Sequence, residues 1–305
     1  MKGKGIRRLL AAVLAASMLF AFAGCKQKEP EVQTPQEPEN PNAAIEYAEE
    51  EANKAGSMWE LICRLFPDYV IYKDNKGGFT YSKVNKDLAL DTFDWSKLGD
   101  AKKGIDVSKY QGNIDWAKVK GADIEYAFIR TGYRGYGAEG KLQEDSLFAQ
   151  NMTGALSNDI AVGVYFVTKA ISVEEAVEEA NFVLDQIKPY NVTYPVVIDI
   201  EPTSNSTDRT GALTAAERTQ YVLAFCNTVK EAGYIPMIYG GVGTFMKYLE
   251  FEKLEGIEKW FAQYFNQPWL RYEFGIWQAS ESGSIPGIKG NVDIDYCIKD
   301  YGKQQ

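Results

Sequence analysis

Two carboxylates at the end of a short apolar run are the residues of this sequence best suited to acid–base chemistry. Asp199 and Glu201 follow the β-branched run 194–198, which predicts a buried strand. Successive side chains of a strand alternate between its faces, so the two acids point the same way, with Cα atoms about 6.5 Å apart. Like charges that close raise the pKa of one carboxyl, which can keep an acid protonated near neutral pH. A strand that simply ends in two solvated acids is the alternative.

The absence of histidine removes several kinds of chemistry. None of the 305 residues is a histidine, which excludes Ser-His-Asp and Cys-His catalysis, histidine-ligated zinc and histidine proton shuttles. With 42 acidic residues against 33 basic ones, carboxylates are the first candidates for proton transfer. The same negative balance is unsuited to nucleic acid, which requires a basic binding surface, so we expect no nucleic-acid partner.

The acids need a scaffold, and the chain from residue 104 onward alternates between short apolar runs and amphipathic segments. The segments that begin Ser172-x-x-Glu175 and Thr214-x-x-Glu217 have the capping-box signature of a helix start. Strands that alternate with helices predict an α/β fold, here an irregular, TIM-like (β/α) barrel of about eight strands. The connections between the last three strands leave little room for helices. The strands are expected at 104–107, 126–131, 161–167, 195–201, 235–239, 259–264, 275–279 and 293–298.

Polar and aromatic side chains fall at the ends of these predicted strands. In a parallel barrel the active site lies at the carboxyl ends of the strands. Acids and rings that converge there suit a sugar, because rings stack on sugar faces while carboxylates transfer protons. Each residue taken alone is more often a core or rim residue, so the argument depends on their joint placement. Besides the pair at 199 and 201, the candidates are Asp106, Gln111, Tyr165, Tyr239, Gln263, Tyr264, Trp277 and Asp293.

The N-terminal segment indicates export. Residues 1–24 have a basic start, an apolar run at 9–22 and small residues at the end, as in a secretory signal peptide. The Phe-Ala-Gly that precedes Cys25 resembles a bacterial lipobox, in which Cys25 would carry the lipid; a plain cleaved signal is the alternative. Residues 25–43, rich in Pro, Glu, Gln and Asn, predict a lipid-anchored flexible linker. We therefore expect an extracytoplasmic protein held to a bacterial membrane and facing the cell wall.

Residues 44–100 are predicted to form an accessory segment ahead of the main domain, 101–305. Apolar residues recur at helical spacing through 44–66, and alternation in 69–72 and 79–84 around a Gly-Gly turn predicts a β-hairpin. The segment either packs on the main domain or binds something of its own. The cysteines after Cys25 match no metal-site spacing, and free buried thiols are expected, with one disulfide as the alternative.

Six motifs in order along 104–300 resemble those of one enzyme family. They are Gly104-Ile-Asp106-Val-Ser108-x-x-Gln111-Gly112, Ala161-Val-Gly-Val-Tyr165, Asp199-Ile-Glu201, Trp260-Phe-Ala-Gln-Tyr264, Trp277-Gln278 and Pro286-Gly-Ile-x-Gly-Asn-Val-Asp293. With them the chain resembles glycoside hydrolase family 25, the muramidases often called Chalaropsis-type lysozymes. It departs from the family where Asp295 replaces a common asparagine and Phe166 a common histidine.

The resemblance implies a peptidoglycan hydrolase that cuts the β-1,4 bond between N-acetylmuramic acid and N-acetylglucosamine. Glu201 would be the general acid, and Asp199 would either stabilise positive charge or orient the acetamido group of the substrate. Asp106 and Asp293 would be the other acids of the groove. We expect a monomer that binds peptidoglycan glycan strands, without cofactor or metal. A non-catalytic wall-binding lipoprotein and an enzyme for another polysaccharide are the alternatives, and the nucleophile is left open.

Overall fold

The computed structural model of the chain describes residues 69–73, 79–83, 100–202, 208–241, 243–264 and 274–303. The chain divides into two compact units, Met1–Asp87 and Leu88–Gln305. The predicted signal peptide, Cys25, the linker and the helix at 44–66 lie outside the described residues. Within the described ranges, no helix is long and apolar enough to cross a membrane.

The described part of the first unit is a β-hairpin. Strand β1 (Tyr69–Lys73) pairs antiparallel with β2 (Phe79–Lys83), so that Tyr69 lies opposite Lys83 and Lys73 opposite Phe79. The alternating pattern around the Gly-Gly turn predicted this pairing, and the hairpin is confirmed.

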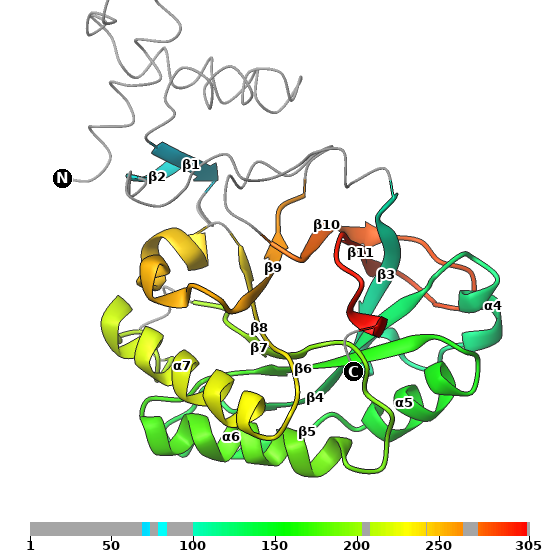
Figure 1. The fold of residues 1–305 in the computed structure, drawn as a ribbon, viewed down its shortest axis with the longest axis horizontal. Helices are drawn as coiled ribbons and strands as arrows, with labels where there is room; N and C mark the ends of the chain where they lie inside the picture. The colour runs from blue at the N-terminus through cyan, green and yellow to red at the C-terminus, as the bar shows by residue number, and fades with distance from the viewer. Residues whose placement is uncertain are drawn as a thin grey trace, which may run out of the picture. The chain divides into compact units, whose positions relative to one another are not determined.

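The second unit is a closed barrel of eight strands (Figure 1). The ring runs in the order β3-β11-β10-β9-β8-β7-β6-β4 and is closed by pairing between β3 and β4. The predicted barrel is therefore confirmed, with strand ends that differ by a few residues from those expected. The strands are β3 (Lys102–Val107), β4 (Tyr126–Arg134), β6 (Ala161–Val167), β7 (Val196–Asp199), β8 (Pro236–Gly241), β9 (Glu258–Ala262), β10 (Ile276–Gly283) and β11 (Val292–Cys297).

One strand of the ring runs against the others. Strand β11 is antiparallel to both of its neighbours, with Asp293 opposite Asp106 on β3. Only eight residues separate β10 from β11, and a parallel connection needs a dozen or more. The barrel is thus mixed rather than wholly parallel. A short strand that the sequence did not predict, β5 (Leu142–Glu144), pairs antiparallel with the end of β4.

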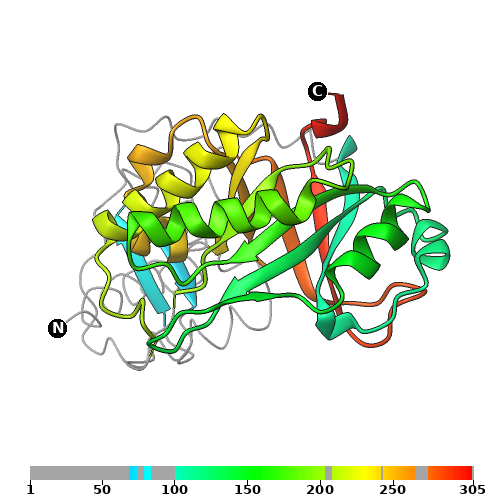
Figure 2. The same cartoon turned by 90° about the horizontal axis from the view of Figure 1, so that it is seen from below.

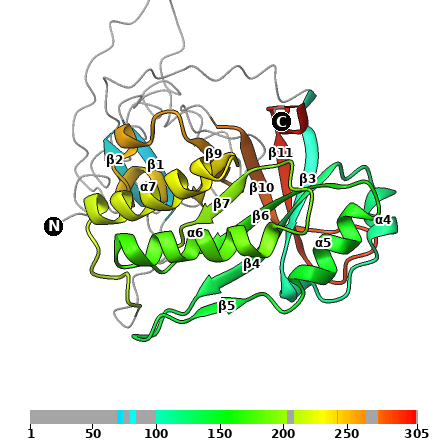
Figure 3. The ribbon, with the colours of Figure 1, turned by 60° about the horizontal axis from the view of Figure 1, so that its bottom comes forward.

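Helices cover the outer face of the barrel. Helices α6 (Val173–Ile187) and α7 (Ala215–Glu231) lie side by side there, and α5 (Phe148–Leu156) and α4 (Trp116–Lys120) lie further round (Figure 1; Figure 3). Seen from below, α6 crosses the outside of the strands (Figure 2). Short helical turns complete the unit: η2 (Lys109–Gln111), η3 (Thr244–Tyr248), η4 (Phe251–Leu254) and η5 (Tyr301–Lys303).

The two predicted capping boxes differ in how they form. At α7 both halves are present, because Thr214 Oγ1 accepts from Glu217 N and the Glu217 carboxylate accepts from Thr214 N. At α6 Ser172 caps Glu175 N, but the Glu175 carboxylate accepts from Ile171 N instead of Ser172 N. The box at α6 is therefore only half formed, and Glu175 Oε1 accepts a hydrogen bond from Arg209 Nη2.

Aromatic rings fill the interior of the barrel. Tyr126 stacks on Tyr194 with ring centroids 4.7 Å apart, and Tyr301 of η5 packs edge-on against Tyr194. Phe128 stacks on Trp260 at 4.5 Å. Burying this much ring surface is a main source of stability.

Candidate active site

A cavity of about 600 Å³ lies at the carboxyl ends of the parallel strands and the amino-terminal end of β11. Most strands of the ring contribute a side chain to it, so residues far apart in sequence meet there. Its lining consists of Asp106, Ser108, Tyr110, Gln111, Arg130, Tyr133, Arg134, Tyr136, Tyr165, Val167, Lys169, Asp199, Glu201, Tyr239, Trp260, Gln278 and Asp293. A polar cleft of this size and make-up suits a sugar ligand.

Asp199 and Glu201 both line the cavity but lie in different surroundings. Strand β7 ends at Asp199, which is buried, whereas Glu201 lies beyond the strand and is exposed. Burial raises the pKa of Asp199 well above its usual range, and the Glu201 charge raises it further. Lys169 and Arg130 lower that pKa. Within the described residues, Asp199 Oδ1 is buried without a hydrogen-bond partner.

A second set of acids lies on the facing strands. Asp106 and Asp293 are paired across β3 and β11, and Asp295 is two residues further into the barrel, opposite Gly104. Burial raises the pKa of Asp106 well above its usual range, with Asp295 and Asp293 adding to the effect. Burial also raises the pKa of Asp293, to about 6. At mildly acidic pH this group of carboxyls therefore holds protons.

Gln278 of β10 joins this acidic set to the tyrosines of the cavity. Its Nε2 donates to Asp106 Oδ2 at 2.7 Å. Its Oε1 accepts from the hydroxyls of Tyr239 at 2.8 Å and of Tyr264 at 2.9 Å. Because Gln278 is only 2% exposed, water cannot readily replace these bonds. The glutamine therefore fixes the orientation of the Asp106 carboxyl.

Trp260 forms the inner surface of the cavity. Its ring lies edge-on to Tyr239 at 4.7 Å and to Tyr165 at 6.2 Å. Its Nε1 donates to Asp295 Oδ1 at 2.9 Å, while Asp295 Oδ2 is buried without a partner among the described residues. The tryptophan thus separates the acids at the mouth from the aromatic core beneath.

The basic and aromatic side of the cavity was not predicted from the sequence. Arg130 projects from the middle of β4 and binds Asp145, with Nε 2.8 Å and Nη2 2.7 Å from Asp145 Oδ2. Its guanidinium lies 5.0 Å from the ring of Tyr110 and 5.8 Å from that of Tyr133. An arginine that directly follows the apolar run Tyr126–Ile129 was the signal that could have identified this side, because a buried cation requires a partner.

The remaining predicted site residues have other surroundings. Gln111 lines the cavity, but its Oε1 caps its own turn by accepting from Ser108 N at 2.8 Å. Tyr264, 44% exposed, reaches the site through Gln278. Trp277 and Gln263 are buried and do not line the cavity; Trp277 Nε1 donates to the Gln263 carbonyl at 2.8 Å. Tyr165, Tyr239, Asp106, Asp293 and the 199/201 pair all meet at the cavity.

Comparison with known proteins identifies the family. The sequence profile described as "Glycosyl hydrolases family 25" matches residues 105–288. The chain belongs to glycosyl hydrolase family 25. It is therefore a glycosidase, and the matched range contains Asp106, Asp199 and Glu201, whereas Asp293 lies just beyond it.

Bacterial relatives resemble this family 25 chain over part of its length. It is 28% identical to the uncharacterized protein YegX of Escherichia coli K12 over 212 residues, covering 63% of this chain and 68% of YegX. It is 25% identical to an autolytic lysozyme of Clostridium acetobutylicum over 195 residues, covering 63% of this chain and 55% of the lysozyme.

Among solved structures, the modular autolysin LytC of Streptococcus pneumoniae has the same fold. The TM-score is 0.57 at 24% identity, and the match covers 75% of this chain and 51% of the LytC chain. The family 25 chain thus spans about half the length of that autolysin. LytC has also been solved in complex with a synthetic peptidoglycan ligand.

Proposed function

We propose that the protein is a lysozyme that cleaves the β-1,4 bond between N-acetylmuramic acid and N-acetylglucosamine in peptidoglycan, with Glu201 as the general acid. The observation that carries this proposal is the placement of a buried Asp199 and an exposed Glu201 at one cavity mouth. The autolytic lysozyme of C. acetobutylicum and the peptidoglycan-bound LytC support the choice of substrate.

The two carboxyls have different roles in this mechanism. Glu201, at the open mouth, gives its proton to the glycosidic oxygen as the bond from that oxygen to the anomeric carbon breaks. Asp199 accepts a hydrogen bond from the acetamido N–H of the substrate at its unpartnered Oδ1. Its negative charge stabilises the positive charge that develops on the sugar. Water then adds its hydroxyl to the anomeric carbon and returns a proton to Glu201.

The other acids and rings bind the sugar in this scheme. Asp106 and Asp293, paired across two strands, offer hydrogen-bond acceptors or, when protonated, donors to sugar hydroxyls. Tyr110 is 77% exposed at the rim, and its ring is available to stack on a sugar face.

The test is cell-wall clearing with chemical identification of the products. Purified protein should lower the turbidity of peptidoglycan suspensions and release fragments with N-acetylmuramic acid at the reducing end. Glu201→Gln should lose nearly all activity, since removal of an acid catalyst costs about 10²–10⁴-fold. Glu231→Gln, an exposed glutamate at the end of α7, is the matched control and should keep the wild-type rate.

The outcome also separates the alternatives. N-acetylglucosamine at the new reducing ends would contradict the assigned bond, and full activity of Glu201→Gln would contradict the assigned acid. Wild-type protein that binds peptidoglycan without releasing fragments would identify a wall-binding protein instead. Cleavage of another N-acetylhexosamine polymer in preference to peptidoglycan would identify a different polysaccharide hydrolase.

We also propose that the enzyme is a monomeric lipoprotein on the outer side of a bacterial membrane, anchored through Cys25 beyond a signal peptide at 1–24. The basic and apolar pattern of that segment and the small residues before Cys25 support this. Cys25→Ala should abolish labelling by a fatty acid and release the protein from the membrane fraction. The matched variant Cys226→Ala should remain labelled; loss of label there, or retention in Cys25→Ala, would contradict the proposal.

A further inference from the structure

Lys169 links the segment that follows β6 to the segment that follows β7 and carries Glu201. It follows β6 and is 9% exposed, yet its side chain lines the cavity. Its ammonium donates to the main-chain oxygen of Glu201 at 2.9 Å and forms an ion pair with Asp208 Oδ2 at 3.0 Å. Asp208 is held in turn by Thr210, whose N and Oγ1 donate to Asp208 Oδ1. One buried cation therefore bridges the segment after β6 and both ends of the segment 201–208.

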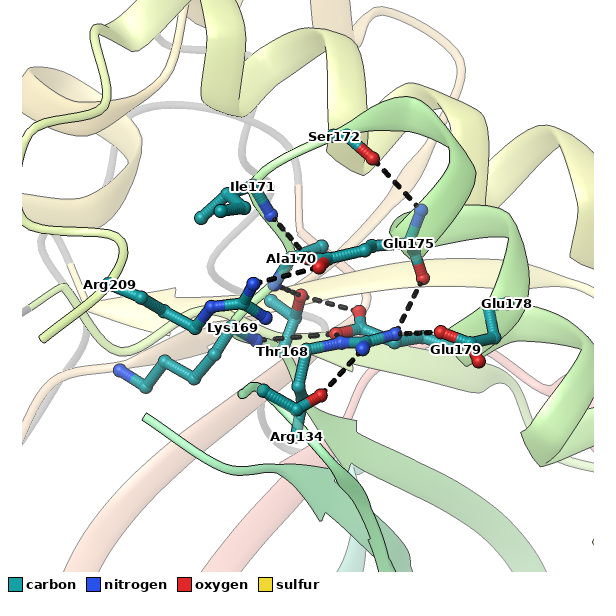
Figure 4. A network of polar contacts seen from close by, with 11 residues as sticks. Arg134, Thr168, Lys169, Ala170, Ile171, Ser172, Glu175, Glu178, Glu179 and Arg209 are labelled. Atoms are coloured by element: carbon teal, nitrogen blue, oxygen red, sulfur yellow. Dashed lines mark hydrogen bonds and ion pairs between the residues drawn. The ribbon is translucent and has the colours of Figure 1, made fainter. Parts of the chain in front are cut away.

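The main chain of Lys169 is fixed by a separate polar network (Figure 4). Thr168 Oγ1 donates to Glu179 Oε2 at 2.6 Å, and Lys169 N donates to Glu179 Oε1 at 3.4 Å. Arg134 Nε holds the same carboxylate at 2.7 Å. In Figure 4 the Lys169 side chain leads away from this network. The network therefore holds the main chain of Lys169, while its ammonium makes contacts elsewhere. A lysine fixed at both ends loses little freedom when the site is occupied.

The charge of this lysine matters because it acts on Asp199, the buried member of the acid pair. Burial and the Glu201 charge raise the pKa of Asp199, whereas Lys169 and then Arg130 lower it. The groups that face Asp199 from the packed elements are Glu201, Lys169, Arg130, Asp106, Tyr165 and Tyr239.

We propose that Lys169 is a positioning residue of this site, whose ammonium fixes the main chain of Glu201 and places beside Asp199 a positive charge that favours its ionised form. The proposal rests on the lysozyme function proposed above. Arg130, which is paired with Asp145, lowers the pKa of Asp199 less than Lys169 does. Lys169 is also paired, with Asp208, but it alone of the two holds the Glu201 main chain as well.

The experiment compares Lys169→Met with Lys169→Arg and with Lys188→Met, a change at an exposed lysine on the C-terminal end of α6. Lys169→Met should lower kcat by about 10- to 100-fold with KM nearly unchanged, because misplacement of a catalytic group affects the reacting geometry more than binding. Lys169→Arg should recover part of the lost kcat. Lys188→Met should keep the wild-type kcat. Thermal unfolding of each variant shows whether it is folded at the assay temperature.

A second readout does not depend on activity. The carboxyl carbon of Asp199, followed by NMR as a function of pH, should titrate at higher pH in Lys169→Met than in the wild type and near its wild-type position in Lys169→Arg. A purely structural lysine would change the unfolding temperature and leave both this titration and the pH profile of kcat in place. Such a result would overturn the proposal.

Failure of this inference is distinguishable from failure of the proposed function. If the wild type releases no peptidoglycan fragments, the lysozyme proposal fails, and the Asp199 titration still decides the role of Lys169. If the wild type is active and Glu201→Gln is not, but Lys169→Met retains the wild-type kcat and titration, only the Lys169 proposal fails.

Discussion

Replacing Gln278 by leucine removes the one side chain that joins Asp106 to Tyr239 and Tyr264. The change keeps roughly the same volume but deletes a donor to Asp106 Oδ2 and an acceptor for two tyrosine hydroxyls. A net hydrogen bond is worth about 1 kcal/mol, and a buried group left unpaired costs about 1–3 kcal/mol. Tyr264 is 44% exposed, so water can satisfy its hydroxyl. Loss of the bonds to Asp106 and Tyr239 should therefore lower the free energy of unfolding by about 3 kcal/mol.

The assay is thermal unfolding, followed by circular dichroism at fixed pH. For a unit of this size, about 3 kcal/mol corresponds to a fall in Tm of about 6–12 °C. Gln220→Leu, at an exposed position of α7, is the matched control and should leave Tm within about 2 °C. Because the Gln278 bond lowers the pKa of Asp106, its loss should also keep Asp106 protonated to higher pH. Any limb of the pH–rate profile that requires ionised Asp106 should also move to higher pH.

A second substitution separates lost hydrogen bonds from altered packing. Gln278→Glu keeps the acceptor for Tyr239 but, when ionised, places another negative charge beside Asp106. Its Tm should therefore lie closer to that of the wild type at pH 5 than at pH 7. A Tm for Gln278→Leu indistinguishable from that of Gln220→Leu would refute the reasoning, since the three bonds would then contribute nothing.

Three further outcomes follow from single contacts. Asp293 has a folded-state pKa of about 6, above the unfolded value of 3.8, so its contribution to stability is present below about pH 4 and is lost as pH rises through about 6; Asp293→Asn should flatten the pH dependence of urea unfolding there. Thr214→Ala removes the cap that accepts from Glu217 N and should cost about 1 kcal/mol by the same measurement, whereas Thr214→Ser should not. Gly104→Ala would place a Cβ 2.3 Å from the ring of Tyr126; overpacking of this kind costs about 1–3 kcal/mol, and an unchanged urea midpoint would contradict the packing described.

The positions of the barrel strands were predictable from the sequence to the extent that local patterns specify them. Short β-branched runs such as Val196-Val197-Ile198 are typical of parallel strands, because such strands are buried on both faces. Strand direction is not a local property. The expected strands at 275–279 and 293–298 leave residues 280–292 between them, about the dozen that a crossover needs. The antiparallel direction of β11 therefore became evident only from the longer β10, which ends at Gly283.

Side-chain direction explains which site residues differ most from their expected places. Trp277 and Gln278 are adjacent in β10, so they face opposite sides of the sheet. The sequence alone does not say which of them faces the barrel interior. The hydrogen bond from Gln278 to Asp106 places the glutamine inside, and Trp277 therefore packs on the outer face against Tyr296, where their ring centroids are 5.6 Å apart.

Contacts between distant segments were the least predictable part of the site. The ion pair of Arg130 with Asp145 depends on the unpredicted β4–β5 pairing, and that of Lys169 with Asp208 depends on how the segment after β7 returns. Neither is encoded in a spacing motif. An unpaired buried cation would cost several kcal/mol, so the composition of the strands could indicate that partners exist but not which acids they are.

The arrangement of charge suggests how a site without histidine separates its proton donors from its acceptors. The largest charge effects on Asp106 come from other acids, Asp295 and Asp293, and all of them favour protonated carboxyls. On the opposite side, Asp199 faces the cations of Lys169 and Arg130, which favour its ionised form. Burial raises the pKa on both sides of the cavity, but the neighbouring charges add to that effect at Asp106, whereas the two cations oppose it at Asp199. Under the proposed function, a sugar bound between them would meet hydrogen-bond donors from the acid cluster on one side and, on the other, a carboxyl whose ionised form the two cations favour, as stabilisation of a developing cation requires.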